Sequence, residues 1–252
     1  MAVSPAEYAP RAAELLRPEP LERTEDAARP DWAVLAPRGA YARVGRPLFL
    51  GGLVALGLPF AVLIAAVVAP INWLVFGRVR SIFFLQPRVG HRGRVFQIWK
   101  FRTMREASRD SHASWSSGED RLRVTRFGRF LRSSHLDELP QIWNVLRGDM
   151  SLIGPRPEMI EVEAWANEHV EGFRERLAIS PGLTGLAQIT QGYTGNDVAA
   201  YAEKLRINRE YLSHLSFSGD ARIVAGTITW MLRGRGWTSF RANHAKSAAE
   251  RA

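Results

Sequence analysis

Residues 47–77, PLFLGGLVALGLPFAVLIAAVVAPINWLVFG, decide the fold, because they hold no charge and are almost wholly apolar. Asn72 is the only strongly polar side chain in this stretch. About 18 uncharged apolar residues in a row already favour a membrane over the core of a soluble protein. The stretch therefore predicts one membrane segment, with a buried helix of a soluble protein as the alternative.

This segment is longer than a bilayer requires. A straight helix over residues 48–76 would run about 44 Å at 1.5 Å per residue, against a hydrocarbon core of roughly 30 Å. Because a proline removes an intrahelical hydrogen bond, we expect a bend at Leu58 and Pro59, with Pro70 as the alternative position. Arginines flank both ends, which favours two cytosolic ends. Together these features favour a re-entrant hairpin dipping into one leaflet over a kinked spanning helix.

The rest of the chain is basic. The formal net charge of the 252 residues is +9, and the first 45 hold seven acids and six arginines, so the body carries about +10. Such a charge suits an anionic membrane surface, phosphorylated substrates or nucleic acid. No helix-turn-helix or aromatic-interleaved basic pattern appears, so we expect no nucleic-acid partner. The absence of Cys excludes disulfides and thiolate metal sites and fits a cytosol-facing protein.

Composition divides the chain into four expected segments. Residues 1–40 hold six of the 14 prolines and predict a flexible extension rich in Pro and Ala. The membrane hairpin and its connection follow at 41–80, the catalytic domain at 81–240 and a tail at 241–252. The predicted fold class is α+β, mainly helical, with a few short strands.

Local patterns place elements inside the third segment. Two short strands are expected around a glycine turn, then a Ser-rich loop, and later two amphipathic helices. Their expected ranges are 82–84 and 95–99 for the strands, 90–93 for the turn, 105–120 for the loop, and 201–215 and 223–232 for the helices.

The stretch most informative about chemistry is 121–158, RLRVTRFGRFLRSSHLDELPQIWNVLRGDMSLIGPRPE. Apolar residues at helical spacing predict a buried face, and three polar residues share another face. The apolar residues are Leu136, Leu139, Trp143 and Leu146, and the polar ones are Asp137, Gln141 and Asn144.

The adjacent acids Asp137 and Glu138 have two readings. Ser134 and Asp137 have the spacing of a capping box, so both acids could simply complement the helix dipole. Pro140 indicates that a helix begins close by, because the missing N–H of proline is tolerated in the first turn and harmful later. A helix start surrounded by Arg126, Arg129, Arg132 and Arg156 also suits a diphosphate, and an ordinary basic surface is the alternative.

Five runs resemble the bacterial sugar transferase family, the monotopic polyprenyl-phosphate phosphoglycosyl transferases. The resemblance covers about residues 44–237, behind the apolar segment. The runs are KFRTM at 100–104, LDELPQ at 136–141, GDMSL at 148–152, GPRP at 154–157 and PGLTGLAQ at 181–188.

This resemblance implies a re-entrant helix in the bacterial inner membrane, a catalytic domain on the cytosolic face and amphipathic helices at the surface. It implies transfer of a sugar 1-phosphate from a UDP-sugar to undecaprenyl phosphate, with release of UMP through a covalent aspartyl intermediate. Asp137 would be the nucleophile and Glu138 the main Mg²⁺ ligand, with Asp137 beside it. Phosphate contacts would come first from Lys100 and Arg156, then from Arg102, Arg126 and Gln188.

The chain departs from the family pattern at three places. Leu58 stands where the family often has Ser before the bend, GRVRS at 77–81 replaces a Ser-Pro-Gly-Pro run, and His135 replaces a small polar residue. An ordinary helix-start histidine is the preferred interpretation of His135, with pocket tuning as the alternative. A transferase that releases UDP and a degenerate scaffolding homologue are the rival functions. The pattern names neither the sugar nor the oligomeric state.

Overall fold

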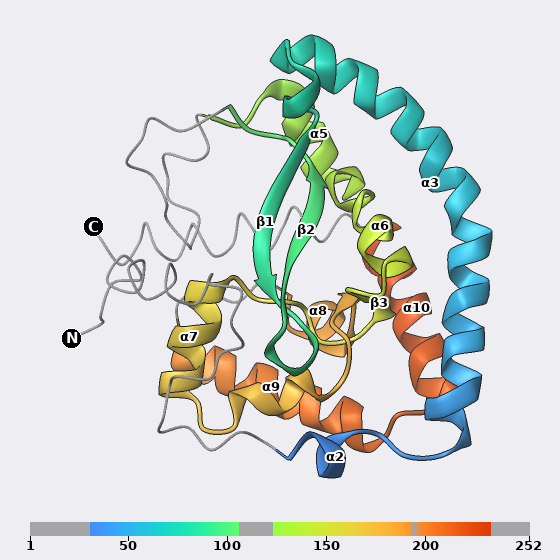
Figure 1. Ribbon diagram of the computed structural model, residues 1–252, viewed down its shortest axis with the longest axis vertical. Helices are drawn as coiled ribbons and strands as arrows, with labels where there is room; N and C mark the ends of the chain where they lie inside the picture. Colours follow the sequence, from blue (N-terminus) through green and yellow to red (C-terminus); the bar gives the residue numbers. More distant parts are fainter. Residues whose placement is uncertain (1–30, 106–122, 193–194, 196, 233–252) are drawn as a thin grey trace.

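The computed structural model describes residues 31–105, 123–192, 195 and 197–232, and within them the chain is mostly helical (Figure 1). The α+β prediction is confirmed at this level. In chain order the elements are α2 (Trp32–Leu35), η2 (Tyr41–Gly45), α3 (Arg46–Phe76), η3 (Val79–Ser81), β1 (Phe83–Val89), η4 (His91–Gly93), β2 (Val95–Phe101), α5 (Arg126–Ser133), η5 (Leu136–Glu138), α6 (Gln141–Leu146), β3 (Ser151–Ile153), α7 (Ile160–His169), η6 (Phe173–Ala178), β4 (Gly182–Thr184), α8 (Leu186–Thr190), α9 (Val198–Ser213) and α10 (Phe217–Leu232).

The apolar segment forms one continuous helix. Pro59 and Pro70 both lie inside α3, and the helix ends at Gly77, whose φ of 71° is the left-handed conformation common after a helix. Figure 1 shows α3 as a long arc along one side of the molecule. Two separate arms meeting at Leu58 and Pro59 are therefore not observed, because the helix accommodates its prolines by curving. The re-entrant course in a bilayer stays a prediction.

Within the part of the chain that the structure describes, most of this helix is exposed. Residues 41–76 are long and apolar enough to cross a membrane, with a mean hydropathy of 2.5 and 17% of the most apolar window buried. Leu56 is 69% exposed, Phe60 64% and Leu63 66%. A core helix of a soluble protein would bury such side chains. The exposure argues against that alternative and indicates membrane association.

Both ends of α3 pack against the rest of the protein. Near its start, Leu50 joins Tyr211 and Ile223 in one buried cluster, and near its end Val68 joins Phe101 and Leu131 in another. The two ends are thus fixed to different parts of the fold, while the middle faces outward.

The contacts of Asn72 explain why the apolar segment contains one polar residue. Its side chain is fully buried, and its Nδ2 donates 3.0 Å hydrogen bonds to the carbonyls of both Ile82 and Arg102. These carbonyls flank the two strands of the hairpin, so Asn72 fastens the end of α3 to the sheet.

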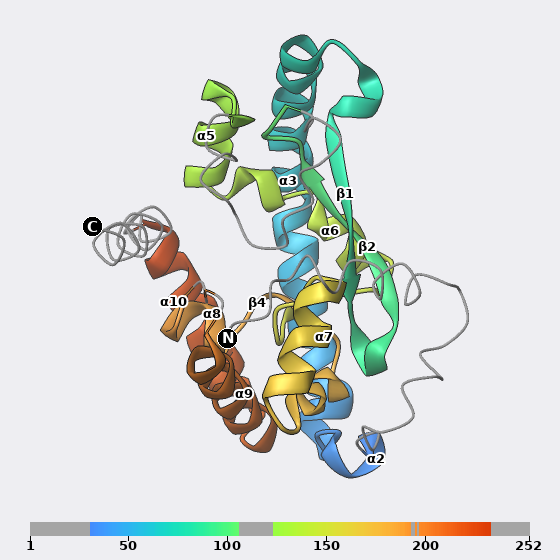
Figure 2. The ribbon, with the colours of Figure 1, turned by 90° about the vertical axis from the view of Figure 1, so that its left-hand side faces the viewer.

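The predicted hairpin is present and longer than expected. β1 and β2 pair antiparallel from Phe83↔Phe101 to Val89↔Val95, around the predicted glycine turn. A second, parallel pair, β3 and β4, aligns Ser151 with Gly182. The first pair forms the long ribbon at the centre of Figure 1 and right of centre in Figure 2.

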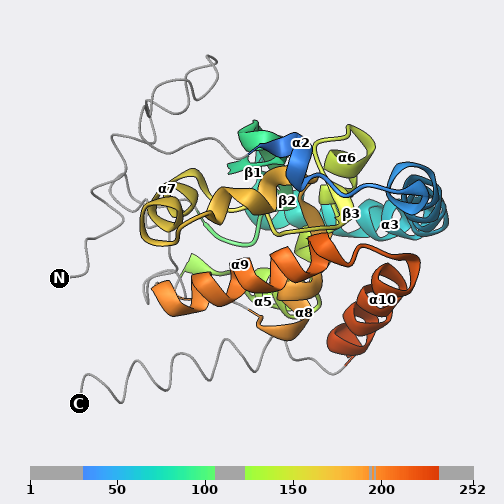
Figure 3. The same cartoon turned by 90° about the horizontal axis from the view of Figure 1, so that it is seen from below.

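The C-terminal helices form the lower part of the molecule, and α9 and α10 confirm the two predicted helices. Figure 3, seen from below, shows α10 beside the start of α3. A buried polar cluster joins them: Asp220 of α10 accepts hydrogen bonds from Tyr41 Oη at 2.7 Å, Tyr211 Oη at 2.8 Å and Arg46 Nε at 3.2 Å. We call these four residues the Asp220 cluster.

One predicted boundary needs correction. Within the expected extension 1–40, residues 32–35 form α2, and Trp32 packs against Val89, Ile160 and Leu177. That part belongs to the folded domain. Residues 1–30, most of the predicted loop 105–120 and the tail 241–252 lie outside the described residues.

Candidate active site

Asp137 and Glu138 lie in a tight turn between α5 and α6, beside β2 (Figure 1). His135 precedes this turn with φ 56°, a left-handed conformation that histidine adopts more readily than most residues. In a 3₁₀ turn, residues three apart share a face. Leu136 and Leu139 accordingly both pack into the cluster around Leu131, which directs the two acids away from the core.

The capping explanation for the acids is wrong. Ser134 ends α5 and donates its hydroxyl to the carbonyl of Phe130 at 2.8 Å, so it caps nothing after it. η5 has no side-chain cap. Neither acid is therefore explained by a helix cap, and Pro140 is the N-cap of α6, close to the helix start that was expected.

The predicted orientation of the helix after the acids is also wrong. Gln141 and Asn144 are fully buried, whereas Trp143 is 49% exposed and Leu146 51%. The helix is interrupted too, because η5 and α6 are separate elements. The spacing identified the two faces correctly, but the polar face points inward, where Asn144 makes hydrogen bonds to β2.

Glu138 is held by two cations from different elements. Lys100 Nζ, from β2, lies 2.7 Å from its Oε1, and Arg156 Nη2, from the segment after β3, lies 2.6 Å from the same oxygen. The three side chains are 13–20% exposed. Burial alone would raise the pKa of Glu138, but the charges of Arg156 and Lys100 outweigh it and hold that pKa well below its usual range. Glu138 is therefore a carboxylate at neutral pH.

Asp137 is the open member of the pair. Among the described residues it has no hydrogen-bond or ion-pair partner. Burial and the neighbouring charge of Glu138 raise the pKa of Asp137 to about 6, against the opposing charges of Lys100, Arg132 and Arg156. Asp137 is thus mostly ionised at neutral pH but weakly stabilised, which is the condition of a reactive carboxylate.

The segment that carries Arg156 is fixed through its main-chain carbonyls. Four successive carbonyls each accept a hydrogen bond from a different donor. Pro155 accepts from Gly182 N at 2.9 Å, Arg156 from Arg176 Nη1 at 3.0 Å, Pro157 from Arg88 Nη1 at 3.1 Å and Glu158 from Val89 N at 3.0 Å. The guanidinium of Arg156 is therefore presented to Glu138 from a fixed backbone.

Glycines make this arrangement possible. A Cβ on Gly182 would lie 2.1 Å from the main-chain nitrogen of Gly154, and one on Gly185 would lie 2.1 Å from the Gly154 carbonyl oxygen. Only glycine permits so close an approach of two backbones. The GPRP and PGLTG runs are therefore two halves of one contact.

The sequence did not single out two arginines, of which Arg176 is buried and Arg88 half-buried. Arg176 is 1% exposed and paired with Glu163, and Arg88 bonds to Gln86 Oε1 at 2.7 Å as well as to Pro157. Burial lowers the pKa of Arg88 to about 10, with the charge of Arg156 adding to the effect. The sequence did carry a signal for the contact of Arg88 with Gln86, because residues two apart on a strand lie on the same face. For Arg176 no local pattern distinguishes a buried arginine from a surface one.

A buried ion pair stands behind this segment. Lys204 of α9 lies 2.6 Å from Glu158 Oε1. Burial opposes ionisation of Glu158, but the charges of Lys204 and Arg176 prevail and lower its pKa to about 2. The helix α9 is thereby tied to the residues that follow Arg156.

Of the predicted phosphate-binding residues, Lys100 and Arg156 meet at the acids, and the other three stay predictions. Arg102 follows β2, half-buried, with its main chain engaged by Asn72 and Ile82. Arg126 is exposed in the first turn of α5, and the α5 arginine whose charge acts on Asp137 is Arg132. Gln188 lies on α8 beside Gly185, and the nitrogen and oxygen of its amide are buried.

The donor set fits Mg²⁺ only together with a ligand. Within the described ranges no three His, Asp or Glu side chains gather to hold a metal. Mg²⁺ is commonly held by one or two carboxylates plus substrate phosphates and waters. Asp137 is open, and Glu138 Oε2 has one contact, 3.4 Å from Arg156 Nη1. Two such carboxylates match that pattern.

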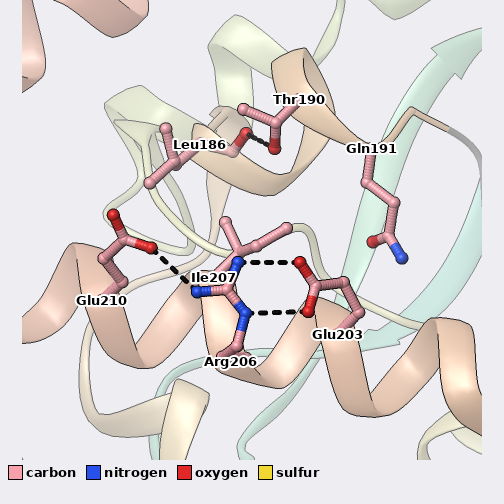
Figure 4. A pocket seen from close by; sticks show the side chains of 7 residues that line it. All are labelled: Leu186, Thr190, Gln191, Glu203, Arg206, Ile207 and Glu210. Atoms are coloured by element: carbon pink, nitrogen blue, oxygen red, sulfur yellow. Dashed lines mark hydrogen bonds and ion pairs between the residues drawn. The ribbon is translucent and has the colours of Figure 1, made fainter.

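A surface pocket of about 360 Å³ lies between α8 and α9, away from the acids. Figure 4 shows Arg206, one of the residues that line it, bridging Glu203 and Glu210. Because this arginine is already engaged by carboxylates, the pocket offers no free cation to a phosphate.

Comparison with known proteins gives the family. The model of a family described as bacterial sugar transferase matches residues 49–234. The chain is 41% identical over 159 residues to the UDP-N-acetylgalactosamine-undecaprenyl-phosphate N-acetylgalactosaminephosphotransferase of Aeromonas hydrophila, covering 62% of this chain and 36% of that protein. It is 38% identical over 180 residues to the UDP-glucose:undecaprenyl-phosphate glucose-1-phosphate transferase of Caulobacter vibrioides, covering 68% and 66%.

The match to longer relatives is partial. An enzyme of Klebsiella pneumoniae with the same printed name as the Caulobacter protein is 35% identical over 173 residues, or 66% of this chain and 37% of that one. The chain thus spans about a third of the length of several curated relatives. The family match includes every residue of the candidate site, and the chain belongs to the bacterial sugar transferase family.

Proposed function

We propose that this chain transfers a sugar 1-phosphate from a UDP-sugar to undecaprenyl phosphate, releasing UMP, and so begins assembly of a polysaccharide or glycoconjugate. One observation carries the proposal: an open carboxylate, Asp137, beside a carboxylate that two cations hold ionised. The names of the relatives, which specify sugar phosphotransferases acting on undecaprenyl phosphate, support the same reaction.

The reaction proceeds in two displacements at one phosphorus atom. A carboxylate oxygen of Asp137 attacks the β-phosphorus of the UDP-sugar, and the bond from that phosphorus to the bridging oxygen breaks, so UMP leaves with the bridging oxygen. A phosphate oxygen of undecaprenyl phosphate then attacks the phosphosugar-aspartyl intermediate. The Asp137–phosphorus bond breaks, which regenerates the carboxylate and yields a sugar diphosphate lipid.

The cations and the metal have separate roles in this proposal. Lys100 and Arg156 contact phosphate oxygens, and Arg102, Arg126 and Gln188 extend that site toward the rest of the substrate. Glu138, with Asp137, would hold Mg²⁺, which offsets the negative charge of a diphosphate meeting an anionic nucleophile.

Product analysis tests the reaction class. The purified full chain in lipid nanodiscs would be incubated with undecaprenyl phosphate, Mg²⁺ and each of a panel of UDP-hexoses and UDP-N-acetylhexosamines. We expect UMP in equal amount to lipid-linked sugar with at least one donor, which also identifies the sugar. Release of UDP would indicate a conventional glycosyl transferase, and no release with any donor would indicate a scaffold.

Trapping tests the covalent step. With a UDP-sugar labelled in the sugar and no lipid acceptor, we expect label bound to the protein and one UMP released per labelled chain. Adding undecaprenyl phosphate discharges that label into lipid. UMP formation only in the presence of the acceptor would contradict the intermediate and favour direct transfer.

Membrane topology is a separate proposal. We infer that α3 enters and leaves the bacterial inner membrane on the cytosolic side, because arginines flank both ends. The chain has no Cys, so Pro20→Cys and Asp110→Cys each introduce one label site. A membrane-impermeant thiol reagent should reach both only from the cytosolic side, whereas labelling from opposite sides would mean a spanning helix.

A further inference from the structure

The free edge of β2 is covered by a side chain instead of a third strand. Among the described residues, β2 pairs with β1 alone, in a two-stranded sheet. On its other edge, the Trp99 main-chain nitrogen donates to Asn144 Oδ1 at 3.0 Å, and Asn144 Nδ2 donates to the Gln97 carbonyl at 2.7 Å. One amide side chain therefore makes both hydrogen bonds that a neighbouring strand would make there.

The same residue organises the end of α6. The main-chain carbonyl of Asn144 accepts hydrogen bonds from Asp149 N at 2.9 Å and Met150 N at 3.2 Å. Its Nδ2 also lies 3.4 Å from Asp149 Oδ2. Asn144 is fully buried, so these bonds are shielded from water.

Asn144 thus joins the two elements that meet at the candidate site. Lys100 directly follows Trp99 on β2, and Glu138 stands in the turn that leads into α6. The ion pair between them spans 2.7 Å, a distance that a small slide of α6 along β2 would change. Through its two hydrogen bonds, the Asn144 side chain links α6 directly to β2, close to the Lys100–Glu138 ion pair.

We propose that Asn144 is a positioning residue, which fixes the strand of Lys100 against the turn of Asp137 and Glu138 and acts on catalysis through the Lys100–Glu138 pair. This role rests on the proposed function and adds a residue that touches neither substrate nor metal. It explains why a buried amide occupies a helix face that spacing alone assigns to solvent.

The chemistry of the position requires an amide. Trp99 needs an acceptor and Gln97 needs a donor, and a neutral amide offers both. Leucine has a similar size and offers neither, so two buried backbone groups lose their partners. Aspartate keeps the acceptor for Trp99 but offers no donor to Gln97 and adds a charge near Asp149.

A double-mutant cycle tests the inference, with Asn144→Leu, Lys100→Met and the double variant in nanodiscs, each normalised to folded monomer. Lys100→Met breaks the same ion pair that Asn144 is proposed to hold. We expect each single variant to lower kcat/KM by about tenfold or more, and the double variant to be within about threefold of Lys100→Met alone. If the two losses multiply, Asn144 acts independently of Lys100 and the proposal is overturned.

Tyr211→Phe is the matched control. It also removes two buried hydrogen bonds, to Asp220 and from Arg46, but in the Asp220 cluster. Its effect on kcat/KM should be small and should multiply with that of Lys100→Met. Coupling as strong as that of Asn144 would mean that any loosening of the core gives the signal, and would also overturn the proposal.

Two further readouts keep the outcomes distinct. If Asn144→Leu does not fold, Asn144→Asp takes its place in the cycle with the same criteria. If the wild-type chain transfers no phosphosugar, the proposed function fails, and thermal unfolding midpoints of the same cycle decide the positioning claim: non-additive midpoints support it and additive midpoints overturn it.

Discussion

Two carboxylate sites in this protein, the Asp220 cluster and the Asp137–Glu138 pair, differ in how completely their charges are paired. In the Asp220 cluster, the carboxylate accepts two tyrosine hydroxyls and the Nε of Arg46, all within 3.2 Å. At the candidate site, Glu138 has two cations, and Asp137 has no partner among the described residues although burial raises its pKa.

The difference separates anchoring from chemistry. A buried charge costs free energy unless it is paired and hydrogen-bonded. The Asp220 cluster meets that requirement completely, and it ties the start of α3 to α9 and α10. At the candidate site Glu138 is paired in this way and Asp137 is not. Asp137 is therefore the acid available to a substrate phosphate.

Replacing Asp137 by Asn should have the largest effect. The change keeps the shape of the side chain but removes the nucleophile, so we expect UMP release to fall by at least about 10³-fold. Membrane association should persist, because α3 is untouched. UMP release at a near-normal rate by this variant would show that Asp137 is not the attacking group.

Replacing Asp220 by Asn should damage the fold instead of the chemistry. Arg46 would keep its burial, with its side chain 13% exposed, and lose its ionic partner. Removing one member of a buried pair costs about 3–5 kcal/mol, so the unfolding midpoint in detergent should fall clearly. The kcat/KM per folded molecule, measured well below that midpoint, should stay close to wild type. A large loss of kcat/KM in folded Asp220→Asn would mean that the two groups are coupled.

The pH dependence of stability sharpens the comparison. Because the pKa of Asp137 is raised to about 6, the folded chain binds more protons than the unfolded chain between about pH 4 and 6. This contribution to stability is therefore present at low pH and lost as pH rises through 6. Asn cannot ionise, so Asp137→Asn should unfold at a higher temperature than wild type at pH 8, by roughly 2–4 °C if the gain is about 1 kcal/mol.

Differential scanning fluorimetry across pH 4–8, with a chelator present, measures this gain. The advantage of Asp137→Asn should be much smaller near pH 4, where the folded wild-type acid is protonated and the unfolded one is about half protonated. An advantage that is equal at pH 4 and pH 8 would show that the gain does not come from ionisation.

Much of the fold was predictable because it follows local rules. The membrane segment, the hairpin around its glycine turn and the last two helices each carry a pattern of their own. The continuity of α3 through Pro59 was not, since a proline marks a lost hydrogen bond and leaves open whether the helix breaks or curves. The inward face of α6 was missed because periodicity identifies faces without giving their direction, and the partner of Asn144 is a strand edge over 40 residues earlier.

The candidate site was predictable only where a motif marks it. The pair Asp137 and Glu138, with Lys100 and Arg156, came from runs that resemble a family. Arg88 and Arg176 act on the main chain of the Arg156 segment, and such contacts form only when distant parts of the chain meet. Arg126 stays a prediction as a phosphate contact, and the α5 arginine whose charge acts on Asp137 is Arg132.

An exposed carboxylate gives the smallest expected effect and sets the baseline for the comparison. Glu203 binds Arg206 through two contacts of 2.8 Å in the lining of the surface pocket, with side chains 46% and 62% exposed (Figure 4). Water and salt screen such a pair. The exposed Glu203–Arg206 pair should therefore stabilise the fold far less than the buried pairs, although its distances are as short. Glu203→Gln should therefore leave both the unfolding midpoint and UMP release unchanged within error, at low and at high salt. A clear loss of stability would mean that close geometry, and not burial, distinguishes these carboxylates, and the contrast between Asp137 and Asp220 would then need another cause.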